Sequence, residues 1–226
     1  GSEMCIRDRN SMQRDYWNKN ALTMNFTTSL DVGQFQSMVS KDALVLDVGC
    51  GYGRTLADLY GIGYKRLIGV DTSGEMVKRG KSAYPYIDMR FQKGAVIDLP
   101  ENYVDAVVLF GVLCCTPDTK DLDVLINEIK RVLKPGGCLF VNDFLIGKDL
   151  RNSLRYRKFE EKYKHYGTFE TDDGLVLRHF SEQELNELLG DFDIVSAVKQ
   201  KCREMNGGVN ISVSIAAKLR QKNSAS

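Results

Sequence analysis

The residues best suited to chemistry lie where a short apolar run gives way to glycine. Residues 43–48 have the pattern of a buried strand, and the next five residues are Gly-Cys-Gly-Tyr-Gly. Glycine has no Cβ, so Gly49 and Gly51 can adopt positive φ and let the main chain approach a ligand closely. Open α/β sheets bind ligands at the carboxyl ends of their strands. The loop therefore predicts a nucleoside-binding site, although a tight strand-to-helix turn would use the same glycines.

Two carboxylates narrow the choice of ligand. A dinucleotide fingerprint reads G-x-G-x-x-G and leaves the helix N-terminus clear for a pyrophosphate, whereas this loop reads G-x-G-x-G. Asp47 would repel a diphosphate but suits a ligand that bears an ammonium and a sulfonium. Asp71 ends the next expected strand, where it can accept hydrogen bonds from both hydroxyls of a ribose. Helix capping is the alternative role for Asp71, but Thr72 is better placed to cap.

A polar, tyrosine-rich stretch at residues 147–180 carries the candidates for proton transfer. The chain has only two histidines, His165 and His179, and a side chain that titrates near neutral pH can act as a general base. We take both, with Tyr163, as catalytic candidates; structural or surface roles are the alternative. One face of an expected helix here carries Tyr156, Phe159, Tyr163 and Tyr166. That face suits either a lid over a ligand or packing on the core.

The same expected helix is strongly basic. Its cations are Arg151, Arg155, Arg157, Lys158, Lys162 and Lys164, against two glutamates. This excess is compatible with an anionic acceptor, and a solvated basic face is the alternative. Near the amino end, Tyr16 and Trp17 are expected either to close over the ligand or to pack in the ordinary way.

Alternating apolar runs and amphipathic stretches predict a parallel α/β sheet. Strands are expected at residues 43–48, 66–70, 87–92, 104–110 and 137–144, with helices between them. The lid-like insertion at 147–180 contains no strand-like run. Capping boxes are expected at Thr72 with Glu75 and at Ser181 with Glu184. Runs at 192–198 and 209–217 then predict an antiparallel hairpin, turned by residues 205–208.

Size and composition limit the organisation and the partners. With 226 residues, 43% of them hydrophobic, the chain suits one domain at 15–219, preceded by a tag-derived or disordered leader at 1–14. Lys plus Arg total 31 against 30 Asp plus Glu, which gives no reason to expect nucleic acid as a partner. No apolar run approaches the roughly 18 residues of a membrane span. Six cysteines without metal-binding spacing predict reduced thiols, no metal and a cytoplasmic location.

The sequence resembles the class I S-adenosylmethionine-dependent methyltransferases, from about Asp15 to the C-terminal hairpin. Residues 45–53 (VLDVGCGYG) look like the first motif of that family, and residues 69–76 (GVDTSGEM) look like the second. Residues 103–109 (YVDAVVL) resemble the fourth-strand motif, and residues 131–137 (RVLKPGG) resemble the turn before strand five. The resemblance implies a three-layer α/β sandwich with a seven-stranded, mostly parallel sheet of order 3-2-1-4-5-7-6. It also implies S-adenosylmethionine as cofactor and S-adenosylhomocysteine as its product.

The resemblance further implies which residues bind the cofactor. The set is Asp47, Gly49, Gly51, Tyr52, Asp71, Thr72, Met76, Ala95, Val96, Phe110 and Gly111. Within it, the glycines of the loop line the methionine and ribose portion, Asp71 holds the ribose, and Thr72 and Met76 flank the adenine. The backbone of Phe110 and Gly111 faces the methyl group.

The chain departs from the family pattern at the adenine edge. Ala95 stands where the family commonly has an Asp that accepts a hydrogen bond from the adenine amino group. The backbone of Ala95 and Val96, or the side chain of Asp98, would have to replace it.

These observations predict a methyltransferase that acts on a small-molecule acceptor by in-line displacement, with no nucleic-acid or membrane partner. A general base is needed for a hydroxyl or ammonium acceptor and is dispensable for an acceptor that arrives ionised. Two alternatives share the fold: an enzyme that transforms the cofactor in another way, and a non-catalytic subunit that binds it. An NAD-dependent oxidoreductase is a third, against which the G-x-G-x-G spacing and Asp47 count.

Overall fold

Strands and helices alternate along most of the chain, as the hydrophobic pattern predicts. The computed structural model describes residues 6–203 and 208–221. The strands are β1 (Leu44–Val48), β2 (Arg66–Asp71), β3 (Asp88–Phe91), β4 (Val104–Phe110), β5 (Leu133–Phe144), β6 (Thr168–Glu170), β7 (Val176–Arg178), β8 (Phe192–Arg203) and β9 (Val209–Leu219). The helices are α1 (Ile6–Asn20), α2 (Val32–Met38), α3 (Arg54–Gly61), α4 (Gly74–Ala83), the 3₁₀ turn η1 (Leu113–Cys115), α5 (Thr119–Val132), α6 (Leu150–Tyr163) and α7 (Glu182–Leu188).

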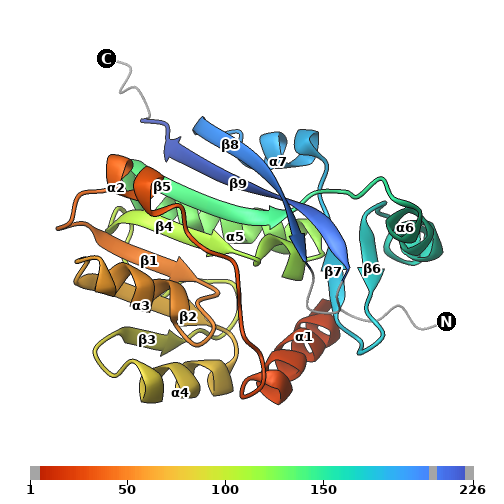
Figure 1. Ribbon diagram of the computed structural model, residues 1–226, viewed down its shortest axis with the longest axis horizontal. Coiled ribbons are helices and arrows are strands. Elements are labelled where there is room, and N and C mark those ends of the chain that lie inside the picture. Colours follow the sequence, from red (N-terminus) through yellow and green to blue (C-terminus); the bar gives the residue numbers. More distant parts are fainter. Residues whose placement is uncertain (1–5, 204–207, 222–226) are drawn as a thin grey trace.

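Seven strands form one sheet in the order β3-β2-β1-β4-β5-β9-β8 (Figure 1). The pairs among β1 to β5 are parallel, whereas β9 runs antiparallel to both β5 and β8. The predicted order 3-2-1-4-5-7-6 is confirmed, because β8 and β9 are the sixth and seventh strands of this sheet. The labels differ only because β6 and β7 form a separate two-stranded sheet.

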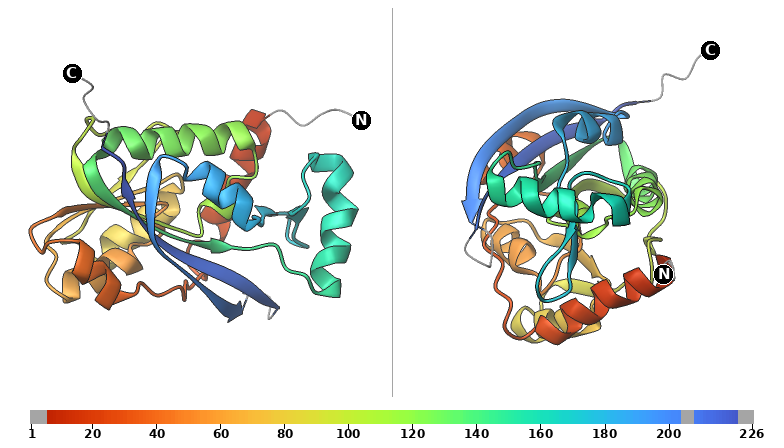
Figure 2. Two further views of the ribbon diagram at one scale, coloured as in Figure 1. Left: turned by 90° about the horizontal axis from the view of Figure 1, so that it is seen from above. Right: turned by 90° about the vertical axis from the view of Figure 1, so that its right-hand side faces the viewer.

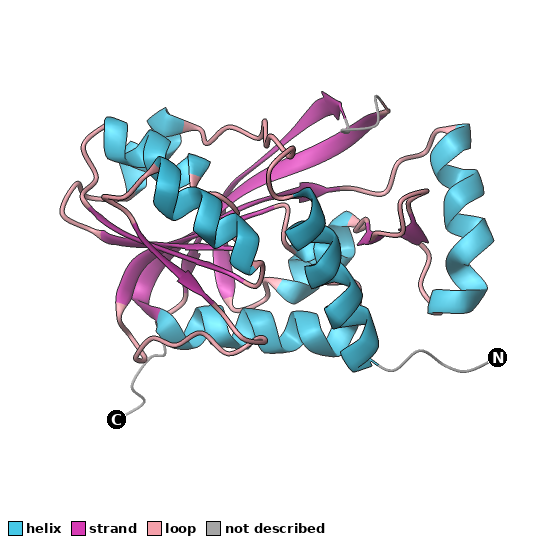
Figure 3. Ribbon diagram, turned by 90° about the horizontal axis from the view of Figure 1, so that it is seen from below, coloured by secondary structure: helices cyan, strands magenta, loops and turns pink. Residues whose placement is uncertain are grey.

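Helices cover both faces of the large sheet (Figure 3). Side chains from α5 and α7 join one buried cluster with alternate residues of the strands. Side chains from α2, α3 and α4 form a second buried cluster with the strand residues on the opposite face of the sheet. This alternation is the period-two pattern of strands buried on both faces, and it gives the three-layer sandwich that was expected.

The lid region differs from the prediction. Residues 147–180 were expected to contain no strand, yet β6 and β7 pair antiparallel there, with Phe169 opposite Leu177. Their small sheet packs against α6, and together they project from one end of the large sheet (Figures 1 and 2). Strands of three residues are too short for periodicity to reveal. Helix α6 ends at Tyr163, so Tyr166 lies beyond the predicted aromatic face.

Three local predictions need correction or lie outside the described residues. The N-cap of α4 is Ser73, whose hydroxyl accepts from the Met76 N–H at 3.2 Å, and not Thr72. Residues 6–14, expected in a disordered leader, form the first part of α1. The predicted hairpin turn falls largely on residues 204–207, which are not described. The capping box of Ser181 and Glu184 is confirmed.

Within the described residues, no helix is both long and apolar enough to cross a membrane. The five cysteines in this part of the chain are free thiols.

Candidate functional site

A single cavity of about 1230 Å³ opens at the carboxyl ends of the central strands. Its walls come from the loops after β1, β2 and β4, from α1, and from the β6–β7 sheet with the adjoining part of β8 and β9. Pockets for one small ligand usually measure roughly 300–1000 Å³. The cavity is therefore large enough for two ligands side by side.

The glycine loop after β1 forms the floor of this cavity. Gly49 has φ of 71° and Gly51 has φ of 54°, the left-handed region that favours glycine. A Cβ on Gly49 would stand 2.4 Å from Val112 Cγ2, and one on Gly51 would stand 2.5 Å from Phe26 Cε2. Both conformation and space thus require glycine at these two positions.

Asp71 fixes the loop to the start of α4. Its Oδ2 accepts the Gly51 N–H and its Oδ1 accepts the Ser73 N–H, each at 2.7 Å. Burial raises the pKa of this carboxyl, and the two N–H donors oppose that rise. Asp71 also lines the cavity, which is the position expected of a ribose acceptor. The same carboxylate joins the glycine loop to the turn before α4.

Asp47 lies beneath the loop with only 3% of its surface exposed. Burial, followed by the charge of Asp71, raises the pKa of Asp47 to about 8, while Arg54 has the opposite effect. The carboxyl lines the cavity. A positively charged ligand group beside Asp47 would favour the ionised carboxylate and so lower its raised pKa.

Three of the four residues predicted to surround the adenine, Thr72, Met76 and Ala95, line the cavity. Val96 does not line it and is 64% exposed. The N–H of the next residue, Ile97, donates to the Glu128 carboxylate at 2.8 Å, so it already has a partner within the protein. Gln92 lines the same wall, and nothing in its sequence context had indicated it.

Tyr52, another predicted cofactor residue, does not line the cavity. Its ring stacks on Phe26 with centroids 5.4 Å apart, and its hydroxyl accepts the Phe26 N–H at 3.3 Å. Tyr52 is therefore placed to position Phe26, which itself lines the cavity against the glycine loop.

The end of β4 reaches the cavity as predicted. Phe110 and Gly111 both line it. The Gly111 N–H donates to the Asn142 carbonyl at 2.8 Å, which keeps the chain beside β5 before it turns into η1. Cys114 and Cys115 of η1 also line the cavity, although the sequence predicted only that the thiols are reduced.

His179 is the one catalytic candidate that reaches the cavity. Its Nδ1 lies 2.7 Å from the Tyr156 hydroxyl, which accepts the Gly147 N–H at 3.2 Å. The Phe144 ring stacks on the imidazole at 5.3 Å between centroids, and the Phe169 ring meets it edge-on at 5.0 Å. The imidazole is thus held in one orientation on the cavity wall.

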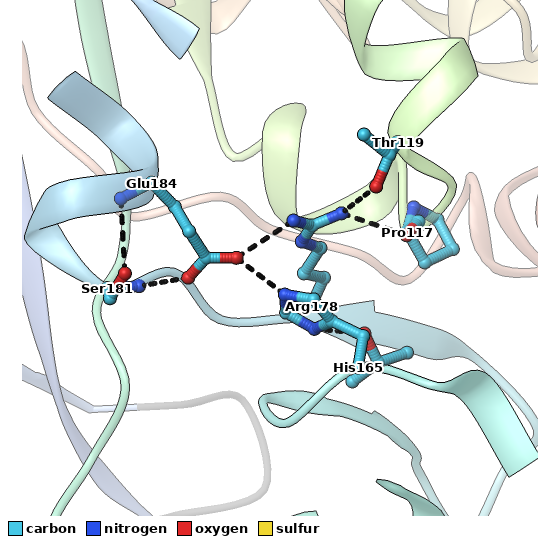
Figure 4. Close-up of polar contacts among 7 residues, drawn as sticks. Pro117, Thr119, His165, Arg178, Ser181 and Glu184 are labelled. Atoms are coloured by element: carbon cyan, nitrogen blue, oxygen red, sulfur yellow. Dashed lines mark hydrogen bonds and ion pairs between the residues drawn. The ribbon is translucent and has the colours of Figure 1, made fainter. Parts of the chain in front are cut away.

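His165 and Tyr163, the other two catalytic candidates, do not line the cavity. The Tyr163 hydroxyl donates to Glu170. His165 Nε2 contacts the Glu184 carboxylate, which also accepts from Arg178 at 2.9 Å (Figure 4). Although burial opposes it, the hydrogen bonds with His165, Ser181 and Arg178 lower the pKa of Glu184 to about 2. We therefore assign these two residues to the structure of the lid.

Helix α1 covers one side of the cavity. The Gln13 side-chain amide donates to the carbonyls of Cys115 at 3.2 Å and Val176 at 2.6 Å. The Tyr16 hydroxyl donates to Asp173 at 2.7 Å. Tyr16 and Trp17 line the cavity, and Trp17 also packs against a buried cluster that includes Tyr52 and Met76. Both roles considered for these residues therefore have support.

Comparisons with known proteins agree with the fold and the motifs. Residues 46–141 match the sequence model of the family described as Methyltransferase domain. A probable S-adenosylmethionine-dependent methyltransferase of Mycolicibacterium smegmatis is 37% identical over 98 residues, 43% of this chain and 37% of that protein. Other curated relatives are named as tRNA and sterol methyltransferases. The chain spans between 35% and 46% of the length of the first three curated relatives.

Solved structures share the architecture over most of the chain. A SAM-dependent methyltransferase from Methanosarcina mazei is similar with a TM-score of 0.81 and 23% identity, over 86% of this chain and 100% of that one. The 1,6-didemethyltoxoflavin-N1-methyltransferase of Burkholderia thailandensis, solved with its acceptor and S-adenosylhomocysteine, has a TM-score of 0.68 and 17% identity, over 98% and 93% of the two chains. The domain match over residues 46–141, the strand order and the glycine loop with its two carboxylates agree with one another: this part of the chain is similar to the methyltransferase domain, and the chain has the fold of the class I S-adenosylmethionine-dependent methyltransferases.

Proposed function

We propose that this protein transfers a methyl group from S-adenosylmethionine to a small-molecule acceptor. The observation that carries the proposal is one continuous cavity, in which the glycine loop and its two carboxylates share walls with His179 and an aromatic lining. One part suits the donor and the other leaves room for an acceptor next to it. Bringing the two together is the main contribution that a protein makes to such a displacement.

The residues present fit the donor. Asp71 offers a carboxylate already oriented by two backbone N–H groups, Asp47 favours the cationic end, and Thr72, Met76 and Ala95 offer a wall for the adenine. S-adenosylmethionine supplies, when bound, an electrophilic methyl group on a sulfonium that is its own leaving group. The residues of this chain orient the donor and the acceptor, exclude water from them, and provide a group that can receive the proton of the acceptor.

His179 is the residue we propose to receive that proton. The 2.7 Å contact of Nδ1 with the Tyr156 hydroxyl fits either tautomer of His179; Nε2 can accept a proton from a hydroxyl or amine when Nδ1 carries the ring proton. Phe144 and Phe169 hold the ring on two sides. This arrangement favours an acceptor that has a protic nucleophile and a flat or apolar body.

Several features support a small acceptor over a nucleic acid. The cavity lies behind α1 and the β6–β7 sheet, with Tyr16, Trp17 and Phe169 among the residues of its walls. The net charge of +1 gives no general attraction for a polyanion. A non-catalytic binding subunit would need no aligned imidazole beside the donor.

Incubation with S-adenosylmethionine and a panel of small-molecule acceptors, followed by mass spectrometry, tests the proposal. The expected product is one methylene heavier than its acceptor, with S-adenosylhomocysteine formed in equal amount. Calorimetry with S-adenosylmethionine alone tests the donor, and no binding at about 1 mM would contradict it. Methylation of tRNA with no small-molecule product would contradict the acceptor class.

Replacing His179 separates proton transfer from binding. His179→Gln is expected to lower kcat roughly 10²- to 10⁴-fold on a hydroxyl or amine acceptor, the usual contribution of a positioned general base. The Kd of S-adenosylhomocysteine should stay the same, because His179 lies in the acceptor part. His165→Gln is the matched control outside the cavity. Equal loss of kcat in both variants would show that the imidazole of His179 acts only structurally.

Asp47 predicts how donor affinity depends on pH. Without ligand its pKa is about 8, so near pH 6 the carboxyl is protonated, and a cationic group beside it must displace that proton. Donor Kd should therefore fall as pH rises from about 6 to 8, by at most about tenfold per pH unit, and level off above. Calorimetry in buffers of different ionisation enthalpy should detect the released proton, and Asp47→Asn should abolish the release. Proton uptake on binding would contradict this coupling.

A further inference from the structure

The cavity wall beside Thr72 carries one polar side chain that the proposed reaction does not use. In the loop between β3 and β4, which the structure describes in full, the residues that line the cavity are Gln92, Gly94 and Ala95. Only Gln92 among these three has side-chain atoms that form hydrogen bonds. Gln92 is therefore the side chain of this loop that can recognise a base by hydrogen bonding.

Asp98, the other polar candidate at this edge, is placed elsewhere. It is exposed and does not line the cavity. The residue before it, Ile97, donates its N–H to Glu128 at 2.8 Å, and its carbonyl accepts from Arg131 at 2.7 Å. These bonds hold that part of the loop against α5. Ala95, which does line the cavity, offers only backbone atoms.

The backbone places Gln92 beside the proposed ribose acceptor. The Gln92 N–H donates to the Asp71 carbonyl at 2.8 Å, one residue beyond the pairing of Asp71 with Phe91 in the parallel strands β2 and β3. Neighbouring strands lie about 4.8 Å apart. A base attached to a ribose at Asp71 therefore comes within reach of the Gln92 side chain.

One hydrogen bond sets the orientation of the Gln92 amide. Its Nε2 donates to the Gly94 carbonyl at 2.9 Å. A carbonyl oxygen only accepts, so the nitrogen of the amide and not its oxygen must face Gly94. Oε1 is then buried with no hydrogen-bond partner among the described residues, although buried polar atoms normally have one. The partner that Oε1 lacks is a donor.

The adenine of the donor has such a group, because its exocyclic amino group donates hydrogen bonds. We propose that Gln92 selects adenine in the donor, with Oε1 accepting a hydrogen bond from this amino group. The terminal torsion of a glutamine side chain has a broad minimum, so Oε1 can turn toward a base on this wall. The assignment rests on the proposed function, since it is S-adenosylmethionine that brings the adenine.

The bond to Gly94 makes the contact selective. In hypoxanthine an oxygen replaces the amino group, so two acceptors would face each other. A half-turn of the amide would present Nε2 to that oxygen, but it would break the bond to Gly94 and set Oε1 against the Gly94 carbonyl. An amide held in one orientation therefore rejects hypoxanthine, whereas a freely turning amide would accept both bases.

Calorimetric titration with S-adenosylhomocysteine and with S-inosylhomocysteine, its hypoxanthine counterpart, measures this selectivity. The unmodified protein is expected to bind the adenine ligand roughly 5- to 150-fold more tightly, because the other ligand leaves a buried acceptor unpaired. Equal Kd values would overturn the assignment of Gln92 and leave the proposed donor standing. No binding of S-adenosylhomocysteine would overturn both.

Two variants of Gln92 separate recognition from packing. Gln92→Met keeps the length of the side chain without its carbonyl and should bind the two ligands with similar Kd values, whereas Gln92→Glu keeps an acceptor and should still prefer adenine. Gln183→Met is the matched control, because Gln183 is exposed on α7, where its Nε2 donates to Glu187 at 2.9 Å. Both ligands are compared on the same variant, so a general loss of stability does not alter the ratio. Full preference for adenine in Gln92→Met would show that Gln92 is only structural.

Discussion

Asp71→Ala is expected to raise the Kd of S-adenosylhomocysteine about 10- to 150-fold. The substitution removes the proposed ribose acceptor and releases the Gly51 and Ser73 N–H groups that the carboxylate now holds at 2.7 Å. Hydrogen bonds to a charged group contribute about 1.5–3 kcal/mol, and 1.4 kcal/mol is a factor of ten in Kd. Calorimetric titration of the purified variant measures the change.

Asp88→Asn is the matched control for this substitution. Asp88 is also a carboxylate of the parallel sheet, but it is exposed, pairs with Arg90 on β3 and does not line the cavity. Exposed ion pairs contribute little, so the control should bind S-adenosylhomocysteine like the unmodified protein. If Asp71→Ala also left the Kd unchanged, the ribose assignment would be wrong.

Gly51→Ala is expected to destabilise the loop and to weaken donor binding. The new Cβ would stand 2.5 Å from Phe26 Cε2, and the residue would keep a φ of 54°. Backbone strain of this kind costs about 1–3 kcal/mol, and relief of the clash must move either Phe26 or the loop. Urea unfolding should show the loss of stability, and calorimetry should show weakened donor binding.

Gly174→Ala separates the effect of strain from that of the clash. Gly174 also has positive φ, 88°, but a Cβ there would meet no atom within 4 Å. Its variant should lose stability through strain alone and keep its affinity for S-adenosylhomocysteine. If both variants lost stability equally and both kept donor affinity, contact between the glycine loop and Phe26 would have no role in binding.

Much of the fold and of the donor site could be predicted from the sequence, because both depend on local rules. Buried parallel strands produce apolar runs, and a glycine loop after the first strand has few structural uses. The end of β2 places Asp71 next to that loop whatever the rest of the chain does, because parallel neighbours end at the same edge. For this reason the positions of Asp47, Gly51 and Asp71 follow from spacing alone.

The acceptor side could not be predicted in the same way, because it depends on contacts between distant segments. His179, His165 and Tyr163 are equally plausible bases in the sequence, and only tertiary contacts place one of them on the cavity. The capping role of Ser73 was assigned to its neighbour Thr72, since either hydroxyl satisfies the local pattern. Tyr52 lies within the first motif, yet its ring packs on Phe26.

The bonds between α1 and the lid have a consequence for the kinetics of turnover. Gln13 joins α1 to both η1 and β7, and Tyr16 joins it to Asp173. One wall therefore borders the donor and the acceptor parts at once. A movement of α1 that breaks these few hydrogen bonds, each worth about 0.5–1.5 kcal/mol, would widen both parts at once. We therefore expect the dissociation rates of the two ligands to change together when these bonds are weakened.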